Sequence, residues 1–291
     1  MSDAPFIDWI TVRQSFSRTE PLPLLFRGVH SYHTADGVCV SERLCAQSVR
    51  GSWDTAINVQ CDGAGILVSG NVGRFGRPDN VFNRSWRGTR EALDRICAAL
   101  SLPHFSVAQL SGSGTAPGQV TSGAIVSTLD VTRNFTCGSD AQAVAFIRYC
   151  SGLNVSRCKR GLAGDDSVWW VNSRRMLKVY RKWTEMVAHG ADPNDPLVVW
   201  CKDNGIVRVE VSMKRRLLND LGLTDFNSIT DEKLAEVYRD ETAFLYKFDS
   251  SDDPDILAAI PARSRAYAAA WLAGQDVRSL CSTATLYRHG R

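Results

Sequence analysis

The sequence predicts an α+β protein with a mainly antiparallel sheet, flanking helices and a helical C-terminal end. Strand-like runs dominate the first hundred residues, a strand, helix and hairpin pattern follows, and helical spacing takes over after Lys214. Runs rich in β-branched and aromatic residues between turn residues are typical of strands, and apolar residues three or four positions apart are typical of helices. Grouped strands followed by grouped helices favour the α+β class.

The first part of the chain reads mostly as sheet. We expect strands at residues 6–13, 39–45, 55–61 and 65–70. Asp62 and Gly63 separate the last two and favour a tight turn. A helix is expected over residues 90–100, where apolar residues have helical spacing. The Gly, Ser and Pro-rich residues 111–118 predict a linker.

The second part begins with a strand at 124–133 and a helix opened by a capping box of Ser139 and Gln142. A hairpin around Asn172 follows. We then expect a helix at 196–202, a strand at 205–214 and helices at 215–221, 231–248 and 261–272. Three consecutive parts result: a β-rich part at 1–118, a central part at 119–225 and a helical part at 226–291.

Composition indicates an ordinary globular chain, with 291 residues and a formal net charge of +3. Its nine cysteines are an odd number without a C-x-x-C pair. This pattern favours reduced thiols in a cytoplasmic protein over disulfides or a zinc site. We find neither a signal segment nor an apolar run of the roughly 20 residues that span a bilayer, so no membrane association is expected.

The most informative stretch is the second strand of the predicted hairpin, which places a tyrosine between lysines. Side chains alternate along a strand, so Lys178, Tyr180 and Lys182 are expected on one face. A tyrosine can form a covalent intermediate, and cations stabilise a transferring phosphoryl group. The alternative is a solvated strand face with a half-buried tyrosine.

Two further strands carry a carboxylate on a polar face. Asp130 lies within 126–132, and Glu210 shares a face with Arg208 on the strand at 205–214. If the three strands are neighbours, these groups converge on one site, and two carboxylates with waters can hold Mg²⁺. The alternative is exposed acids paired with basic residues. Glu185 could be another ligand, a partner of Lys182 or the beginning of a helix.

Basic residues gather in two stretches that also contain tryptophans, a composition that suits a nucleic-acid surface. A solvated charged surface is the alternative. The candidate DNA-binding residues are Arg74, Arg77, Arg174, Arg175, Lys178 and Arg181. Among the histidines no H-x-H pair occurs, which disfavours a histidine metal site; His30 and His33 are expected in a loop-like region.

Several motifs occur together in a recognisable order. They are FIDWITV near the N-terminus, GRPDNVF at 76–82, STLDVTRNF around Asp130, Y-x-K-x-x-E from Tyr180 to Glu185, and VRVEVSMKRRLLNDLGL at 207–223. This ordered set resembles the gene II replication initiators of filamentous bacteriophages and the related phage and plasmid replication initiation factor family. Thr128 and Asp79 depart from the family pattern, in which a basic residue and a histidine are common.

The resemblance implies a rolling-circle initiator nuclease-like fold and an enzyme that nicks the plus origin of a circular replicative form. Tyr180 would become linked to the 5′ phosphate, with Lys182 as its electrostatic helper. Asp130 and Glu210 would hold Mg²⁺ or Mn²⁺. Apart from the resemblance, Glu185 and Arg208 are candidates for supporting the site. The implied partners are DNA and a host helicase and polymerase, in the cytoplasm of a bacterial host.

Two other functions remain open. A non-catalytic DNA-binding regulator or replication accessory would keep the basic surface without the chemistry, and would bind DNA in a salt-sensitive way. A plasmid mobilisation relaxase would differ mainly in the biological event that it serves.

Overall fold

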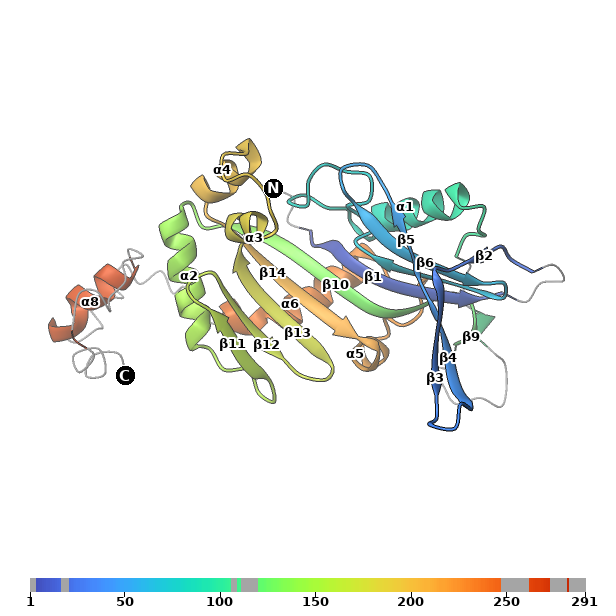
Figure 1. Ribbon diagram of the computed structural model, residues 1–291. Coiled ribbons are helices and arrows are strands. Elements are labelled where there is room, and N and C mark those ends of the chain that lie inside the picture. Colours follow the sequence, from blue (N-terminus) through green and yellow to red (C-terminus); the bar gives the residue numbers. More distant parts are fainter. Residues whose placement is uncertain are drawn as a thin grey trace. The chain divides into compact units, whose positions relative to one another are not determined.

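The structure is a computed structural model that describes residues 4–16, 21–105, 109–110, 120–246, 262–272 and 282. Two compact units make up the chain (Figure 1). Unit 1 contains residues 1–133, 173–175 and 211–240, and unit 2 contains residues 134–172, 176–210 and 241–291. Each unit combines segments separated in sequence, so the three consecutive parts expected above do not coincide with these units. The expected linker at 111–118 lies outside the described residues.

Unit 1 is built on an antiparallel sheet with β1 (Phe6–Ser15) at its centre. One side of β1 pairs with β10 (Ile125–Thr136), and the other pairs with β7 (Gly65–Gly70), which in turn pairs with β6 (Ala56–Asp62). The expected strands in these regions are confirmed, with ends shifted by a few residues. Alternate apolar side chains of these strands form the core, among them Ile10, Val12, Val59, Val68 and Leu129.

A hairpin stands apart from this sheet. Its strands are β3 (Gly28–His33) and β4 (Cys39–Cys45), which pair only with each other among the described strands. Figure 1 shows the hairpin extending away from the other strands of unit 1. The expected strand at 39–45 is confirmed, whereas the loop expected around His30 and His33 is wrong, because both residues belong to β3.

The strict alternation expected along β10 is interrupted. Thr11 pairs with Thr128 and Val12 with Val126, so Ser127 is an extra residue in a β-bulge. As a result Val126 and Leu129, which a regular strand would place on opposite faces, are both fully buried.

The helices of unit 1 begin with α1 (Trp86–Ala99), four residues earlier than expected. Ser85 caps it by accepting a hydrogen bond from the Gly88 amide. The other helices of this unit in the described residues are α5 (Arg215–Asp220) and α6 (Asp231–Thr242), whose last two residues are assigned to unit 2. Trp86 packs edge-on against Phe226 with ring centroids 5.0 Å apart, so α1 is held by the segment before α6.

Unit 2 contains the strands β11 (Lys159–Ala163), β12 (Ser167–Val171), β13 (Arg175–Arg181) and the first part of β14 (Ile206–Lys214), neighbours in this order. The hairpin around Asn172 is confirmed as β12 and β13. The strand β11 was not expected.

Helix α2 (Asp140–Gly152) covers this part of the sheet and lies beside β11 and β12 in Figure 1. Ser139 caps it, as predicted, by accepting from the Gln142 amide. The fully buried Trp170 of β12 donates from Nε1 to the Leu153 carbonyl, 3.1 Å away, which joins the end of α2 to the sheet. Among the residues that the structure describes, unit 2 also contains α3 (Lys182–Ala188), α4 (Pro196–Asp203), the short 3-10 helix η1 (Ala243–Tyr246) and α8 (Ala262–Leu272).

The fold is therefore α+β with a mainly antiparallel sheet and flanking helices, as predicted. None of the helices in the described parts of the chain combines the length and apolar composition that a membrane crossing requires.

Candidate active site

Tyr180 and Glu210 meet in unit 2, where β13 and β14 are neighbouring strands. The Tyr180 hydroxyl donates a hydrogen bond to Glu210 Oε2, 3.2 Å away. Tyr180 is only 4 % exposed, and Glu210 is half-buried. The structure thus brings together two of the groups that sequence patterns suggested, a phenol and a carboxylate able to accept its proton.

A lysine covers the tyrosine ring. Lys178, two residues earlier on the same face of β13, holds its Nζ 4.6 Å from the centroid of the Tyr180 ring. On the facing strand β12, Ser167 is the partner of Tyr180 and Trp169 the partner of Lys178. A positive charge is therefore placed next to the phenol, where it favours the developing charge of a phenolate or a phosphate.

Lys182 lies elsewhere than expected. The strand β13 ends at Arg181, so Lys182 is the first residue of α3 instead of a third residue on the polar strand face. It is 1 % exposed, and its Nζ lies 2.5 Å from Glu185 Oε2. Glu185 lies in the first turn of α3 and pairs with Lys182, which agrees with the alternative of a partner for this lysine.

Glu185 is surrounded by cationic groups. Burial would raise the pKa of its carboxyl, but the charges of Lys182, Arg208 and His189 together hold that pKa below its ordinary value. His189 Nε2 lies 3.8 Å from Glu185 Oε1. The carboxylate therefore remains charged and balances the buried cations around it.

Arg208 is the second fully buried cation of the unit, at 0 % exposure. The expected alternation along β14 is present, since Val207, Val209 and Val211 are buried and Glu210 is not fully so. Yet the polar face is not solvated at Arg208, whose Nε donates to Asn134 Oδ1 at 2.9 Å. A buried guanidinium needs such partners because leaving its charge unpaired in the protein interior strongly destabilises the fold.

Arg181 ties the end of β13 to two other segments. Its Nη1 donates to both oxygens of Asp140 at 2.9 Å, and its Nη2 contacts Asp166. Asp140 also accepts a 2.7 Å hydrogen bond from Trp183 Nε1. The Asp140 carboxylate thus contacts Arg181 and Trp183, the two residues that flank Lys182. Arg181 also directly follows Tyr180.

Asp130 belongs to unit 1. It is half-buried on β10 and pairs with Trp9 of β1. Its predicted role as a second metal ligand stays a prediction. Within the described residues no group of three or more His, Cys, Asp or Glu side chains is arranged to hold a metal ion. Mg²⁺ commonly uses only one or two carboxylates together with waters and substrate phosphates, and Glu210 offers such a ligand.

The remaining predicted DNA-binding residues lie in unit 1. Arg77 forms an ion pair with Asp79 at 3.7 Å, and Arg174 contacts Asp220. The Arg74 amide donates to Asn71 Oδ1 at 3.0 Å, and Arg175 is half-buried. Asp79 accepts hydrogen bonds from the amides of Val81 and Phe82, which gives this departure from the family pattern a structural role. DNA binding by these arginines stays a prediction.

Sequence reasoning did not single out several residues that contact Arg181, Arg208 or Glu185: Asn134, Asp140, Asp166 and His189. Asp140 could be recognised only as an acid in the first turn of a capped helix, a position that favours negative charge. Its contact with Arg181 joins residues 41 positions apart, which no local pattern indicates.

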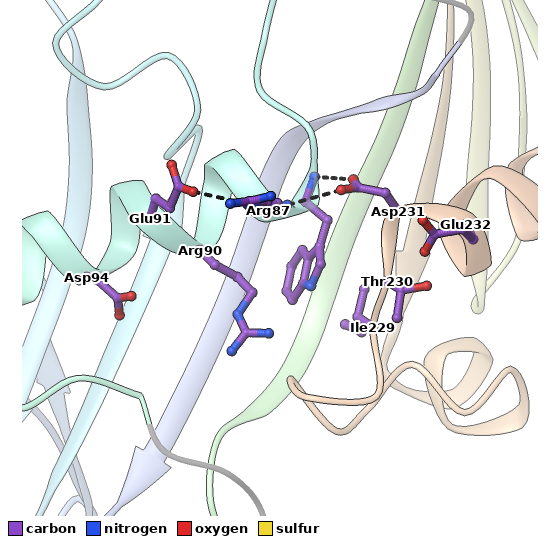
Figure 2. A pocket seen from close by; sticks show the side chains of 9 residues that line it. Arg87, Arg90, Glu91, Asp94, Ile229, Thr230, Asp231 and Glu232 are labelled. Carbon is purple, nitrogen blue, oxygen red and sulfur yellow. Dashed lines mark hydrogen bonds and ion pairs between the residues drawn. The ribbon is translucent and has the colours of Figure 1, made fainter.

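A separate pocket of about 350 Å³ lies in unit 1 at the beginning of α1. Figure 2 shows Asp231 facing this helix end and Arg87 turned toward Glu91. Asp231 accepts hydrogen bonds from the amides of Trp86 and Arg87, so the positive end of the helix dipole already has a carboxylate. The basic residues Arg87 and Arg90 line this pocket together with four acidic residues, Glu91, Asp94, Asp231 and Glu232, so the lining does not favour an anion.

Comparisons with known proteins place the chain in a family. It is 25 % identical over 205 residues to the replication-associated protein of Escherichia phage If1, a match that spans 59 % of this chain and only 62 % of that relative. A solved rolling circle replication initiator protein from Geobacillus stearothermophilus covers 80 % of this chain and 79 % of its own at 13 % identity, but its TM-score of 0.33 is too low to support an argument. The family model of the N-terminal part of the phage replication-associated protein matches residues 6–232, and the chain therefore belongs to that family.

Proposed function

We propose that this chain starts rolling-circle replication by cutting one strand of a circular duplex DNA at its origin, with Tyr180 as the nucleophile. Membership of the phage replication-associated protein family supports a role in replication. The single observation that carries the proposed chemistry is the hydrogen bond from the Tyr180 hydroxyl to Glu210. A nucleophile within hydrogen-bond reach of a base is the arrangement that covalent catalysis requires.

In the proposed reaction the Tyr180 oxygen attacks a backbone phosphorus while its proton passes to Glu210. The bond between phosphorus and the 3′ oxygen breaks, so that the 5′ phosphate remains on tyrosine and the 3′ oxygen takes up a proton to become a free hydroxyl. That hydroxyl can prime synthesis. A later attack by a 3′ hydroxyl on the phosphotyrosine reverses these bond changes and closes a strand.

Two lysines would assist this step. Lys178 holds its ammonium group over the tyrosine ring, and Lys182 is buried at the beginning of the next helix. Positive charge beside the reacting phosphate stabilises the transition state more than the ground state. Because Lys182 is paired with Glu185, its charge is balanced before DNA binds.

Glu210 is also the proposed ligand of Mg²⁺ or Mn²⁺, with Asp130 as the second ligand suggested by sequence. Carboxylate oxygens suit either ion. When bound, the metal would supply charge neutralisation and polarisation of the phosphodiester. DNA inside a bacterial host cell, a host helicase and a host polymerase are the proposed partners.

The direct test uses labelled single-stranded oligonucleotides of random sequence with Mg²⁺, followed by denaturing electrophoresis. The wild-type chain should form a protein-DNA adduct, and Tyr180→Phe should form none. Tyr238→Phe, which changes a buried tyrosine of α6, should keep the adduct and serves as the matched control. An equal adduct yield from Tyr180→Phe would identify another nucleophile. Salt-sensitive DNA binding with no wild-type adduct would favour a non-catalytic DNA-binding protein.

A further inference from the structure

The hairpin of β3 and β4 interrupts the outer strand of the sheet in unit 1. The strands β2 (Leu24–Leu25) and β5 (Gln47–Arg50) both pair with the edge of β6 that β7 leaves open. Leu25 pairs with Cys61 and Gln47 with Val59, so the two strands follow one another along that edge. The chain between them leaves the sheet as a two-stranded ribbon that is anchored at both ends.

Both ends of the ribbon are closed by hydrogen bonds. At its base the Arg27 amide donates to the Cys45 carbonyl at 2.9 Å. At its tip the Thr34 amide donates to the Val38 carbonyl at 2.9 Å, and Gly37 adopts a φ of +84° that glycine tolerates. The ribbon is thus an ordered arm that presents its side chains at fixed positions.

The two faces of this arm differ in chemistry. Cross-strand pairs His30 with Arg43 and Tyr32 with Ser41 share one face, which we call the donor face. Pairs Val29 with Leu44 and Ser31 with Glu42 share the other. All four side chains of the donor face are exposed, Tyr32 by 63 %.

Each side chain of the donor face can donate a hydrogen bond, and Arg43 adds a permanent positive charge. None of the four is a carboxylate. The acids of the arm lie elsewhere, because Glu42 belongs to the opposite face and Asp36 to the turn at the tip. A ligand rich in acceptors and negative charge therefore complements the donor face and would be repelled by the other two surfaces.

We infer that the donor face of the β3–β4 ribbon binds double-stranded DNA in the major groove and reads its sequence. This inference rests on the proposed function, since it takes origin DNA as the partner. The major groove is wide enough to admit a two-stranded ribbon, and its base edges present acceptors that arginine, histidine and hydroxyl groups can contact. Arg43, near the middle of the exposed face, is the residue best placed to contact guanine.

The experiment compares the two faces of the same arm. Duplexes that bind the wild-type chain are selected from a random-sequence library, and the Kd of each variant is measured for a selected and an unrelated duplex. Arg43→Ala should weaken binding to the selected duplex by roughly fivefold to a hundredfold, and binding to the unrelated duplex much less. Glu42→Ala, at another exposed site on the opposite face, should stay within about twofold of wild type for both duplexes.

Three results would overturn the inference. The first is an equal change in the Kd for the selected duplex in Arg43→Ala and in Glu42→Ala. The second is that the wild-type chain enriches no sequence from the random library. The third is a change in molecular mass by light scattering in Arg43→Ala with unchanged DNA affinity, which would show that the arm pairs two copies of the chain.

The adduct assay with single strands separates this inference from the proposed function. Arg43→Ala should form the Tyr180 adduct at the wild-type rate. If the wild-type chain forms no adduct while Arg43→Ala still loses the selected duplex, the nicking proposal fails and DNA reading by the arm stands.

Discussion

The surroundings of Tyr180 in unit 2 and the β3–β4 arm of unit 1 use the same residue types in opposite ways. In unit 2 the proposed nucleophile Tyr180 and the cations Lys182 and Arg208 are 4 %, 1 % and 0 % exposed, and each contacts an acid or an amide. On the arm, Tyr32 and Arg43 face solvent. Buried polar groups need hydrogen-bond partners within the protein, whereas exposed ones are hydrated and remain accessible to a ligand.

This difference in burial indicates which of two tasks, chemistry or recognition of a ligand, each group of basic and aromatic residues could serve. Paired and buried groups keep one geometry, which favours chemistry at Tyr180. Exposed donors on a ribbon are accessible to a ligand, which favours the recognition of DNA that we infer for the arm. Substitutions in the buried set should therefore change reaction rate and stability, and substitutions on the arm should change only binding.

The largest effect is expected from Glu210→Gln. Glutamine can still accept the Tyr180 hydrogen bond but cannot take its proton, so adduct formation should slow by roughly 10²–10⁴-fold. Single-turnover kinetics on a single-stranded oligonucleotide measure this rate. Ser212→Ala, two residues further along β14, is the control and should react like wild type. A Glu210→Gln rate near that of the control would contradict a role for Glu210 in the reaction.

Glu185→Gln should cause the largest loss of stability. It leaves the buried Lys182 without its carboxylate, and breaking a buried pair costs about 3–5 kcal/mol, reduced here because the Glu185 side chain is 23 % exposed. Urea denaturation measures the free energy of unfolding. Adding Lys182→Met to this variant should recover part of the loss by removing the buried charge that Glu185 balanced. If Glu185→Gln unfolds like wild type, the pair is not a structural support.

Asp140→Asn should have a smaller effect on stability, of about 1–3 kcal/mol, because it weakens the charged contact with Arg181. We also expect a slower adduct rate with an unchanged Kd for single-stranded DNA, since Arg181, directly after Tyr180, loses one of the two carboxylates that it contacts. Trp183→Phe removes the other donor to Asp140 but keeps an aromatic ring beside Arg181, and is the matched control. Equal behaviour of the two variants would argue against a positioning role for the Arg181 contact.

Acid sensitivity should provide the smallest effect. The folded-state pKa of Glu185 lies below its ordinary value of 4.5, so its stabilisation is complete above pH 4.5 and is lost as the pH falls through the folded-state pKa. The difference in unfolding free energy between wild type and Glu185→Gln should therefore shrink only below pH 4.5. A constant difference across that range would mean that the carboxylate charge does not matter.

Patterns local to one element were the predictable part of this structure. The valines of β14, the Ser139 cap and the hairpin around Asn172 all follow from residue type and spacing within a few positions. The closeness of Tyr180 and Glu210 could also be suggested, because two amphipathic strands with polar faces need only become neighbours in one sheet.

Features that depend on distant partners could not be predicted. The strand β13 ends at Arg181, whose side chain pairs with Asp140 and Asp166. The position of Arg208 in the alternation suggested a solvated side chain. Its burial depends on Asn134, whose Oδ1 accepts a hydrogen bond from Arg208 Nε. The bulge at Ser127 likewise depends on the register with β1.

The central claim is that Tyr180 becomes covalently linked to DNA, and peptide mapping tests it most directly. The wild-type chain is incubated with oligonucleotides and Mg²⁺, the adduct is digested with nuclease and protease, and the modified peptide is sequenced by mass spectrometry. We predict a nucleotide attached through its 5′ phosphate to Tyr180. Attachment to a different residue, or a 3′-linked nucleotide, would contradict the account.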